Sequence, residues 1–232
     1  MNFKGINKAN MITDKKTAAF FDFDGTLYDG VVAFDFLRFA IKNKSLNLKE
    51  MAKLPGFLYY YTLDKFKIAD RYDVNVRIYK KVKGWNSETL ESTSRDFFRS
   101  KLKKRLIPEM IEVLEEHKLK GHTVIIVTSA LREIVVPIAE WLDIDELIAS
   151  EVVVDNSKYT GVIRRLPVGK MRIQVISDYC ITHNIDIGKS FAYSDHYSDI
   201  PLLRSVGNPI ATNPERKMRK YAKKHGWKIM DC

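Results

Sequence analysis

The sequence contains little cysteine and no long apolar run. Only Cys180 and Cys232 occur among 232 residues, and their spacing matches neither a zinc site nor a disulfide framework. The N-terminal stretch MNFKGINKANMITDKK lacks the apolar core of a signal peptide, and nowhere do about 18 uncharged apolar residues follow one another. We therefore expect a soluble protein in a reducing, cytoplasmic setting.

Internal repeats, low-complexity tracts and long flexible linkers are also missing from the sequence. Apolar residues make up 45% of the chain, which is ample for a packed core. The length suits one large domain, or a core domain with a modest insertion. These features exclude disordered and fibrous proteins.

Acidic residues are scarce in two stretches that together carry the net charge of +10. Residues 99–105 hold five basic residues and no acid, and residues 214–228 hold seven basic residues and one acid. Such stretches attract nucleic acid or an anionic membrane surface. They are equally typical of solvated helix faces in a lysine-rich protein, which is the simpler interpretation. The sequence leaves both open.

Short strand-like runs alternate with amphipathic helical segments. Strand patterns occupy residues 17–22, 122–128, 189–195 and 208–212, and helical patterns occupy residues 108–120, 130–142, 168–184, 198–206 and 214–226. This alternation predicts an α/β fold, a doubly wound parallel sheet with helices on both faces. Ligands of such sheets bind beyond the carboxyl ends of the strands, where Asp22, Thr128 and Asp195 stand.

Two segments depart from the alternation. Residues 30–106 show no clear buried strand but many aromatic residues at helical spacing, which predicts an all-helical cap inserted after the first strand. The core domain then comprises residues 1–29 and 107–232. Residues 151–163 hold two β runs around Asn156 and Ser157, which indicates a β-hairpin.

Asp22 and Asp24 directly follow a buried strand, where charge is costly. A bound divalent cation offsets crowded negative charge, and hard carboxylate oxygens suit Mg²⁺. Asp195 and Asp199 follow another strand, so the four acids are candidates for one cluster. A carboxylate also attacks phosphorus to give an aspartyl-phosphate, while a second one transfers protons.

The chain resembles phosphatases of the haloacid dehalogenase superfamily, in the subclass (IB) near phosphoserine phosphatase. The four family motifs are similar to DFDGTLYD (22–29), VIIVTSA (124–130), GK (169–170) and YSDHYSDIPLL (193–203), and the closing segment is similar to NPIATNPERKMRKYAKKHGW (208–227). A lone DxD is weak evidence, whereas four motifs in the family order are specific. The resemblance spans nearly the whole chain outside the inserted segment.

This resemblance implies catalytic roles for three residues. Asp22 would be the nucleophile, Asp24 the general acid and base, and Lys170 the cation that neutralises charge on nucleophile and phosphate. Lys170 by itself reads more simply as a surface lysine, and only its place between the second and fourth motifs supports the role. Asp22 and Asp24 also have an ordinary explanation, as capping residues of a turn before a helix.

The resemblance also implies a phosphate site and a metal site. Thr128 would bind the phosphoryl oxygens, with the adjacent Ser129 as the alternative and Gly25 of the first motif nearby. Both hydroxyls also suit the start of a helix. The Mg²⁺ site would be formed by the acids of the first and fourth motifs, with the backbone carbonyl of Asp24 as one ligand: Asp22, Asp24, Asp195 and Asp199. Asp199 also suits a helix N-terminus.

The expected function is hydrolysis of a small phosphorylated metabolite. Phosphoserine phosphatases carry a glutamate for the substrate's amino group about nine residues after the first aspartate, and Val31 stands there in this chain. Several cap residues are candidates for further anionic groups or belong to a solvated helix face: Lys65, Lys67, Arg71, Tyr72 and Arg77. The alternatives are a phosphotransferase or phosphomutase with the same chemistry, and a basic nucleic-acid-binding module with a vestigial site.

Overall fold

The computed structural model describes residues 15–65 and 68–232, and in this part of the chain seven strands form one sheet. The order is β4-β3-β2-β1-β5-β6-β7, and neighbouring strands are parallel except for antiparallel β3 and β4. The strands are β1 (Ala18–Phe21), β2 (Thr123–Leu131), β3 (Glu146–Asp155), β4 (Lys158–Arg165), β5 (Phe191–Ser194), β6 (Asn208–Thr212) and β7 (Lys228–Met230). The predicted α/β class is confirmed.

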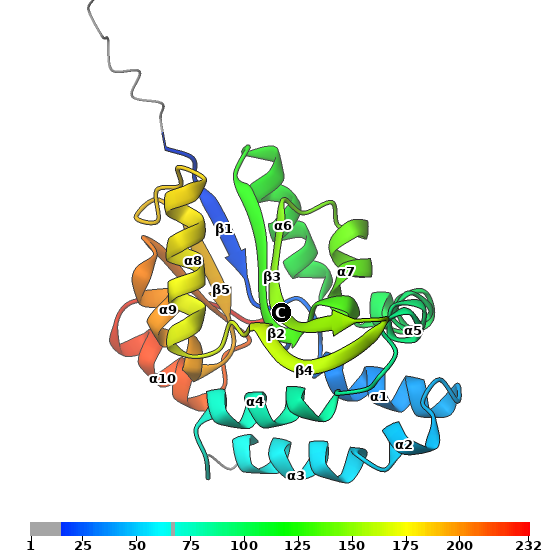
Figure 1. Ribbon diagram of the computed structural model, residues 1–232. Helices are drawn as coiled ribbons and strands as arrows, with labels where there is room; N and C mark the ends of the chain where they lie inside the picture. The colour runs from blue at the N-terminus through cyan, green and yellow to red at the C-terminus, as the bar shows by residue number, and fades with distance from the viewer. Residues whose placement is uncertain (1–14, 66–67) are drawn as a thin grey trace, which may run out of the picture.

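Helices cover both faces of the sheet (Figure 1). One face carries α6 (Pro108–Leu119) and α7 (Arg132–Trp141), and the other carries α8 (Lys170–Thr182), α9 (Ile200–Ser205) and α10 (Arg216–Lys224). Alternation along β1 explains this arrangement, because Ala19 and Phe21 join one buried cluster while Ala18 and Phe20 join the other. A strand buried on both faces must be apolar throughout, as β1 is.

The described residues between 32 and 105 form helices without a strand. They are α1 (Val32–Lys42), α2 (Leu48–Met51), α3 (Leu54–Lys65), α4 (Arg71–Lys81), α5 (Ser87–Ser100) and the 3₁₀ helix η1 (Leu102–Arg105). Figure 1 shows them gathered at one end of the sheet. Phe36 and Phe97 of these helices belong to the same buried cluster as Phe21 of β1, so the apolar core continues from cap to sheet. The division into two domains stays a prediction.

The predicted hairpin is β3 and β4, joined at Asn156 and Ser157. These residues have φ values of +47° and +58°, as a two-residue type I′ turn requires. The cap rests on this hairpin through backbone hydrogen bonds: Gly84 N–H donates to the Tyr159 carbonyl (2.7 Å), and Tyr159 N–H donates to the Trp85 carbonyl (3.0 Å). The hairpin thus joins the sheet to the helical segment.

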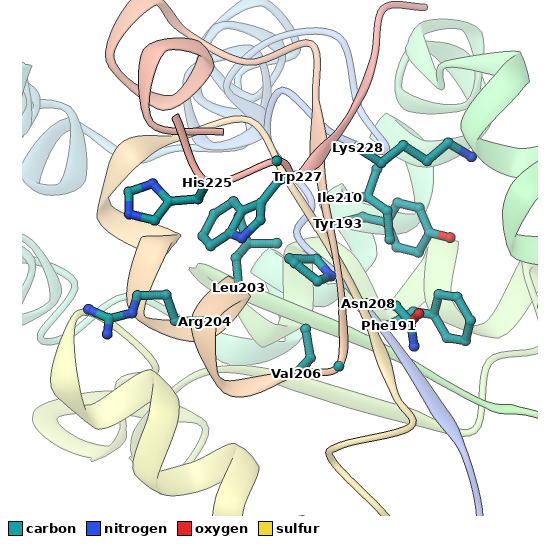
Figure 2. A pocket seen from close by; sticks show the side chains of 13 residues that line it. Phe191, Tyr193, Leu203, Arg204, Val206, Asn208, Ile210, His225, Trp227 and Lys228 are labelled. Atoms are coloured by element: carbon teal, nitrogen blue, oxygen red, sulfur yellow. The ribbon is translucent and has the colours of Figure 1, made fainter. Parts of the chain in front are cut away.

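A pocket of about 640 Å³ lies at the amino ends of β5, β6 and β7, where Phe191, Asn208 and Lys228 begin these strands (Figure 2). It therefore lies at the edge of the sheet opposite to the strand ends that carry the acidic residues. Of the helices described, none is long and apolar enough to cross a membrane. Cys180 is buried and Cys232 is exposed, and both are free thiols.

Candidate active site

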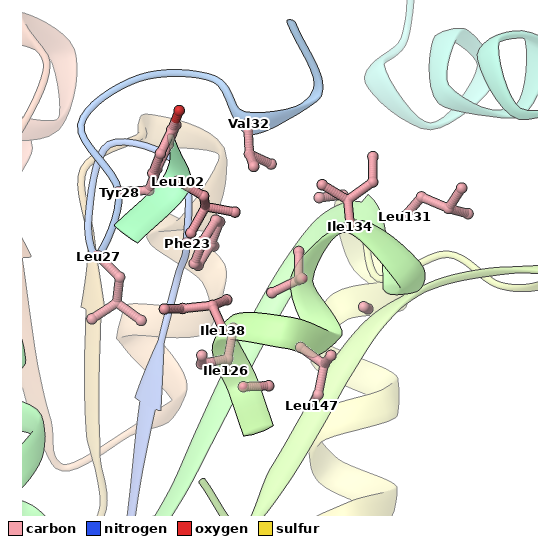
Figure 3. Close-up of a cluster of buried hydrophobic side chains, with 14 of the residues drawn as sticks. Phe23, Leu27, Tyr28, Val32, Leu102, Ile126, Leu131, Ile134, Ile138 and Leu147 are labelled. Atoms are coloured by element: carbon pink, nitrogen blue, oxygen red, sulfur yellow. The ribbon is translucent and has the colours of Figure 1, made fainter. Parts of the chain in front are cut away.

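The turn after β1 positions the first two aspartates. The Phe23 carbonyl accepts hydrogen bonds from Leu27 N–H (3.0 Å) and Tyr28 N–H (2.9 Å), which closes a tight turn. The side chains of these three residues are fully buried in the apolar cluster that also contains Ile134 and Ile138 of α7 (Figure 3). Because the turn is anchored from within, the backbone of Asp22 and Asp24 on either side of Phe23 is fixed as well.

Asp22 is buried at the carboxyl end of β1 and paired with an arginine. Its Oδ1 lies 3.3 Å from Arg172 Nη2, and Arg172 Nη1 lies 2.6 Å from Asp199 Oδ2. The hydroxyl of Ser194, the last residue of β5, donates to the same Asp199 oxygen at 2.7 Å. Arg172 therefore bridges the acid of the first motif and the second acid of the fourth motif.

The acids of this cluster have shifted pKa values. Burial raises the pKa of Asp22 to about 7 although Arg172 opposes the shift. Burial, reinforced by the charge of Asp22, raises the pKa of Asp195 to about 8. Burial also acts on Asp199, but there the nearby Arg172 charge prevails and holds the pKa below its usual value. The cluster thus gathers more negative charge than Arg172 alone compensates.

Asp195 lies against Gly25 of the first motif. Gly25 has φ +77°, and a Cβ at this position would come within 2.3 Å of Asp195 Oδ2. Asp195 Oδ1 is buried without a hydrogen-bond partner. The two ends of the core sequence therefore converge closely enough to forbid a side chain between them.

The carboxylate oxygens of the site are suitable ligands for a divalent cation. Asp22 and Asp195 are buried carboxylates, the charge of Asp22 raises the pKa of Asp195, and the orphaned Asp195 Oδ1 lacks the partner that a cation would provide. The described residues contain no group of three or more His, Cys, Asp or Glu side chains placed to hold a metal. Mg²⁺ needs no such group, because it takes one or two carboxylates and keeps several waters.

Asp24 has the capping role that the sequence suggested as an alternative. Its Oδ1 accepts a hydrogen bond from Val32 N–H at 2.8 Å, and Val32 is the first residue of α1. Burial nevertheless outweighs this hydrogen bond and raises the pKa of Asp24 to about 6. Only Oδ1 of Asp24 takes part in this hydrogen bond, and Oδ2 does not. It also ties a candidate catalytic residue to the first helix of the cap.

Thr128 and Ser129 occupy different environments. The Thr128 side chain is buried, and its Oγ1 accepts from Ala130 N–H at 3.0 Å, so the hydroxyl proton remains available to a ligand. Ser129 contributes its backbone carbonyl, which accepts from the hydroxyls of Tyr79 in the cap and of Ser150 in β3. The geometry favours Thr128 as the hydroxyl of the second motif.

Lys170 is not placed as the motif suggested. It is the exposed first residue of α8, and among the described residues no ion pair or hydrogen bond joins it to the acidic cluster. Arg172, two residues later, is 4% exposed and makes both ion pairs. The physical reason is helical geometry: Arg172, Ile176 and Cys180 form the buried stripe of α8, and Lys170 lies off this stripe.

Arg71 is the cap residue from the predicted basic set that reaches the core. Its Nη1 donates to His196 Nδ1 (2.9 Å) and to Ser198 Oγ (2.5 Å) in the loop after β5. Tyr72 and Arg77 on the same helix are exposed. Lys67 and the side chain of Lys65 lie outside the described residues.

A cavity of about 540 Å³ reaches the metal-site candidates from the side of η1. Its lining includes Gly25 and Asp195 together with Lys104, Asn213 and Cys232. It also brings Lys104 and Arg105 of the first basic stretch close to the C-terminal Cys232. In the second basic stretch, part of the charge is neutralised locally, because Arg219 of α10 forms an ion pair with Asp231.

A family model described as haloacid dehalogenase-like hydrolase matches residues 19–204, which include the acidic cluster, Thr128 and Arg172. The chain belongs to this family. It is 27% identical over 229 residues to an inhibition of morphological differentiation protein of Streptomyces azureus, covering 98% of this chain and 82% of that protein. It is 26% identical to a probable phosphatase of Mycobacterium tuberculosis, covering 93% and 75% of the two chains.

Solved structures of the family share the fold. A protein of unknown function from Bordetella pertussis Tohama I superposes with a TM-score of 0.83 at 21% identity, covering 94% of this chain and 99% of that one. A substrate-bound phosphoserine phosphatase superposes with a TM-score of 0.67 at 19% identity, covering 93% of each chain. The family model, the phosphatases among the relatives and the shared fold together confirm the predicted resemblance to phosphoserine-phosphatase-like hydrolases.

Proposed function

We propose that this hydrolase releases phosphate from a small phosphate monoester through an aspartyl-phosphate on Asp22. The observation that carries the proposal is the buried position of Asp22 at the end of β1, with Arg172 on Oδ1. Asp24 stands two residues away, and Asp22 is close enough to Asp195 to raise the pKa of that second carboxyl group. Phosphatases among the relatives support this choice.

The reaction divides into two displacements at phosphorus. In the first, a carboxylate oxygen of Asp22 forms a bond to phosphorus while the ester P–O bond breaks, and Asp24 gives its proton to the departing alkoxide. In the second, water attacks the same phosphorus, Asp24 takes the water proton, and the bond to Asp22 breaks. A pKa of about 6 suits Asp24 to both roles near neutral pH.

Positive charge and hydrogen-bond donors hold the phosphoryl group. In the proposal, Arg172 takes the role that the motif suggested for Lys170, because its guanidinium already contacts the nucleophile. Thr128 donates its free hydroxyl proton to a phosphoryl oxygen, and the backbone at Gly25 leaves room for the group to approach. Asp199 orients Arg172 through their ion pair.

The carboxylates of Asp22 and Asp195 and the backbone carbonyl of Asp24 would hold Mg²⁺, with Asp199 acting on the site through Arg172. The bound ion would supply the positive charge that the crowded acids and the phosphate require. Val31 stands in α1's N-cap position without an acid for a substrate amine, so we propose a metabolite other than phosphoserine. The relatives named phosphoserine phosphatase do not determine the substrate of this chain.

The experiment compares the parent protein with Asp22→Asn and Asp24→Asn, using free-phosphate release from a panel of phosphate esters with Mg²⁺. We expect Asp22→Asn to lower kcat by about 10³-fold or more, because the amide cannot replace the carboxylate as the nucleophile. Asp24→Asn should slow breakdown of a phosphoenzyme that rapid quenching detects. Asp29→Asn is the matched control, since Asp29 lies in the same turn with an exposed side chain.

An Asp22→Asn protein as active as its parent would contradict the proposal. Transfer of the phosphoryl group to an added alcohol rather than to water would favour the phosphotransferase alternative. Product analysis by mass spectrometry separates these two outcomes.

A further inference from the structure

The outer surface of the cap exposes apolar side chains. Among the described residues, seven of the thirteen exposed large apolar side chains lie between residues 41 and 72. Five of the seven come from the end of α1 and from α2 and α3: Ile41, Leu48, Met51, Leu58 and Tyr59. Single exposed apolar residues are ordinary on a protein surface, whereas a group of them marks an interaction site.

The position of α3 in the cap explains part of this exposure. α3 packs on α4, and α4 in turn packs on β4 of the sheet. α3 is therefore the outermost layer of the cap, at the rim of the molecule farthest from the sheet (Figure 1). No further element of the described chain covers its outer side in this view.

One side of α3 packs against the cap, and the remaining side carries exposed residues. Phe57 contacts Trp85 at a ring-centroid distance of 5.7 Å, and Leu54 packs against the same buried cluster. Leu58 and Tyr59 lie on the remaining side and are 59% and 60% exposed. Because α3 is apolar on both sides, packing within this chain leaves part of its apolar surface in water.

The exposed charge in the same segment is positive. Residues 36–63 hold five basic residues and one acid, Glu50. Glu50 is buried, and its side chain closes the capping box at the start of α2. Lys42, Lys44 and Lys49 are exposed, and none of them forms an ion pair with another described residue. This surface therefore combines apolar side chains with lysines whose charge no neighbouring acid compensates.

We propose that this outer face of the cap, formed by the end of α1, α2 and α3, binds the surface of an anionic lipid bilayer. Leucine and tyrosine side chains enter the boundary between headgroups and acyl chains, while lysines on flexible stems reach the headgroup phosphates. Binding of this kind is peripheral and needs no helix that crosses the membrane.

A second copy of the chain is a poorer occupant of this face. Two such faces would place like charges against each other, in a chain whose net charge is +10. No residue of the face belongs to the proposed catalytic machinery. The inference therefore stands independently of the phosphatase function, and it is tested by binding rather than by turnover.

The experiment measures co-sedimentation of the protein with two kinds of vesicle, phosphatidylcholine alone and phosphatidylcholine mixed with an equal part of phosphatidylglycerol. We expect the parent to bind the mixed vesicles about tenfold more strongly or better, because each lysine near an anionic surface adds attraction. Most of this difference should disappear in about 0.5 M salt, which screens the attraction.

Two double variants separate the apolar and the charged contributions. Leu58→Gln with Tyr59→Gln should weaken binding to the mixed vesicles about tenfold or more, because less apolar area leaves water. Lys44→Gln with Lys49→Gln should remove most of the preference for the mixed vesicles. All four positions are exposed, so we expect both variants to fold, which circular dichroism checks.

Each double variant has a matched control outside the cap. Ile181→Gln replaces an exposed apolar residue of α8. Lys220→Gln with Lys224→Gln removes two exposed lysines of α10, in the second basic stretch of the sequence. We expect both controls to bind the mixed vesicles as the parent does.

Several results would overturn the inference. A parent that leaves the mixed vesicles unbound would do so, as would a Leu58→Gln, Tyr59→Gln protein that binds them as tightly as the parent. Loss of binding in the α10 control alone would assign the membrane contact to the second basic stretch. Dimers in analytical ultracentrifugation that the Leu58→Gln, Tyr59→Gln protein does not form, without vesicle binding by the parent, would make the face an interface between copies.

Discussion

Arg172 and Asp22 form a buried ion pair in which Nη2 lies 3.3 Å from Oδ1. The arginine comes from α8 and the aspartate from the end of β1, about 150 residues earlier in the chain. Burial of a charge is costly unless a partner of opposite sign compensates it. The pair therefore belongs both to the stability of the core and to the chemistry of the site.

Arg172→Met is expected to destabilise the protein by about 3–5 kcal/mol, because it leaves the charges of Asp22 and Asp199 buried without their partner. It should also remove most of the phosphatase activity. Lys170→Met is the matched control on the same helix, and we expect its effect on stability to stay within about 0.5 kcal/mol. Urea unfolding and phosphate release measure both variants. If Lys170→Met lost more turnover than Arg172→Met, Lys170 rather than Arg172 would be the cation that neutralises the nucleophile and the phosphate.

Gly25→Ala tests the close approach of the two ends of the core sequence. The added Cβ would lie 2.3 Å from Asp195 Oδ2, so the Asp195 carboxylate must shift. We expect activity to fall about 100-fold, because a displacement of this order misaligns the reacting groups. Gly121→Ala is the control: Gly121 has φ +69°, and nothing lies within 4 Å of its Cβ position.

Both glycine variants carry similar backbone strain, on the order of 1 kcal/mol. Their difference therefore isolates the steric effect on Asp195. Thermal unfolding shows whether each variant is folded under the assay conditions. Equal activities of the two variants would mean that Asp195 tolerates the displacement.

The stability of the protein should fall in acid because of His117. Its Nε2 is paired with the Tyr193 hydroxyl (2.9 Å) and its Nδ1 with His122 Nδ1 (2.7 Å). Burial, helped by the charges of His122 and Lys120, lowers the pKa of His117 to about 4 from 6.5. Between these values the unfolded chain binds more protons than the folded one, so the free energy of unfolding decreases as the pH falls.

The decrease attributable to His117 is at most about 3 kcal/mol. Chemical unfolding at several pH values between 4 and 7 measures it, with His117→Gln compared against His225→Gln, which removes an exposed histidine. The slope should become shallower in His117→Gln and remain in His225→Gln. An unchanged slope in His117→Gln would place the acid sensitivity elsewhere.

The sequence predicted the sheet and most of the site for identifiable reasons. Runs of β-branched and aromatic residues marked β1, β2, β5 and β6. The parallel half of β3 was missed because it follows α7 almost directly, and β7 was missed because it has three residues. Local pattern is weak for strands whose extent is set by neighbouring strands rather than by their own residues.

Arg172 was missed for a different reason. Arginine is usually exposed, so within a helical pattern it reads as part of the solvent face. A signal was present nonetheless, because Arg172 precedes Ile176 and Cys180 at intervals of four and so lies on the apolar stripe of α8. The partners of this arginine, Asp22 and Asp199, follow β1 and β5 in the sequence, and only the folded chain shows that they meet it.

The hairpin that supports the cap also has a consequence for solubility. β4 is the last strand on its side of the sheet, and a free strand edge offers unpaired backbone groups to other chains. Here Tyr159 uses its N–H and carbonyl to bind Trp85 and Gly84, so the helical segment shields part of this edge. Deleting the cap to open the site would therefore expose a template for edge-to-edge aggregation.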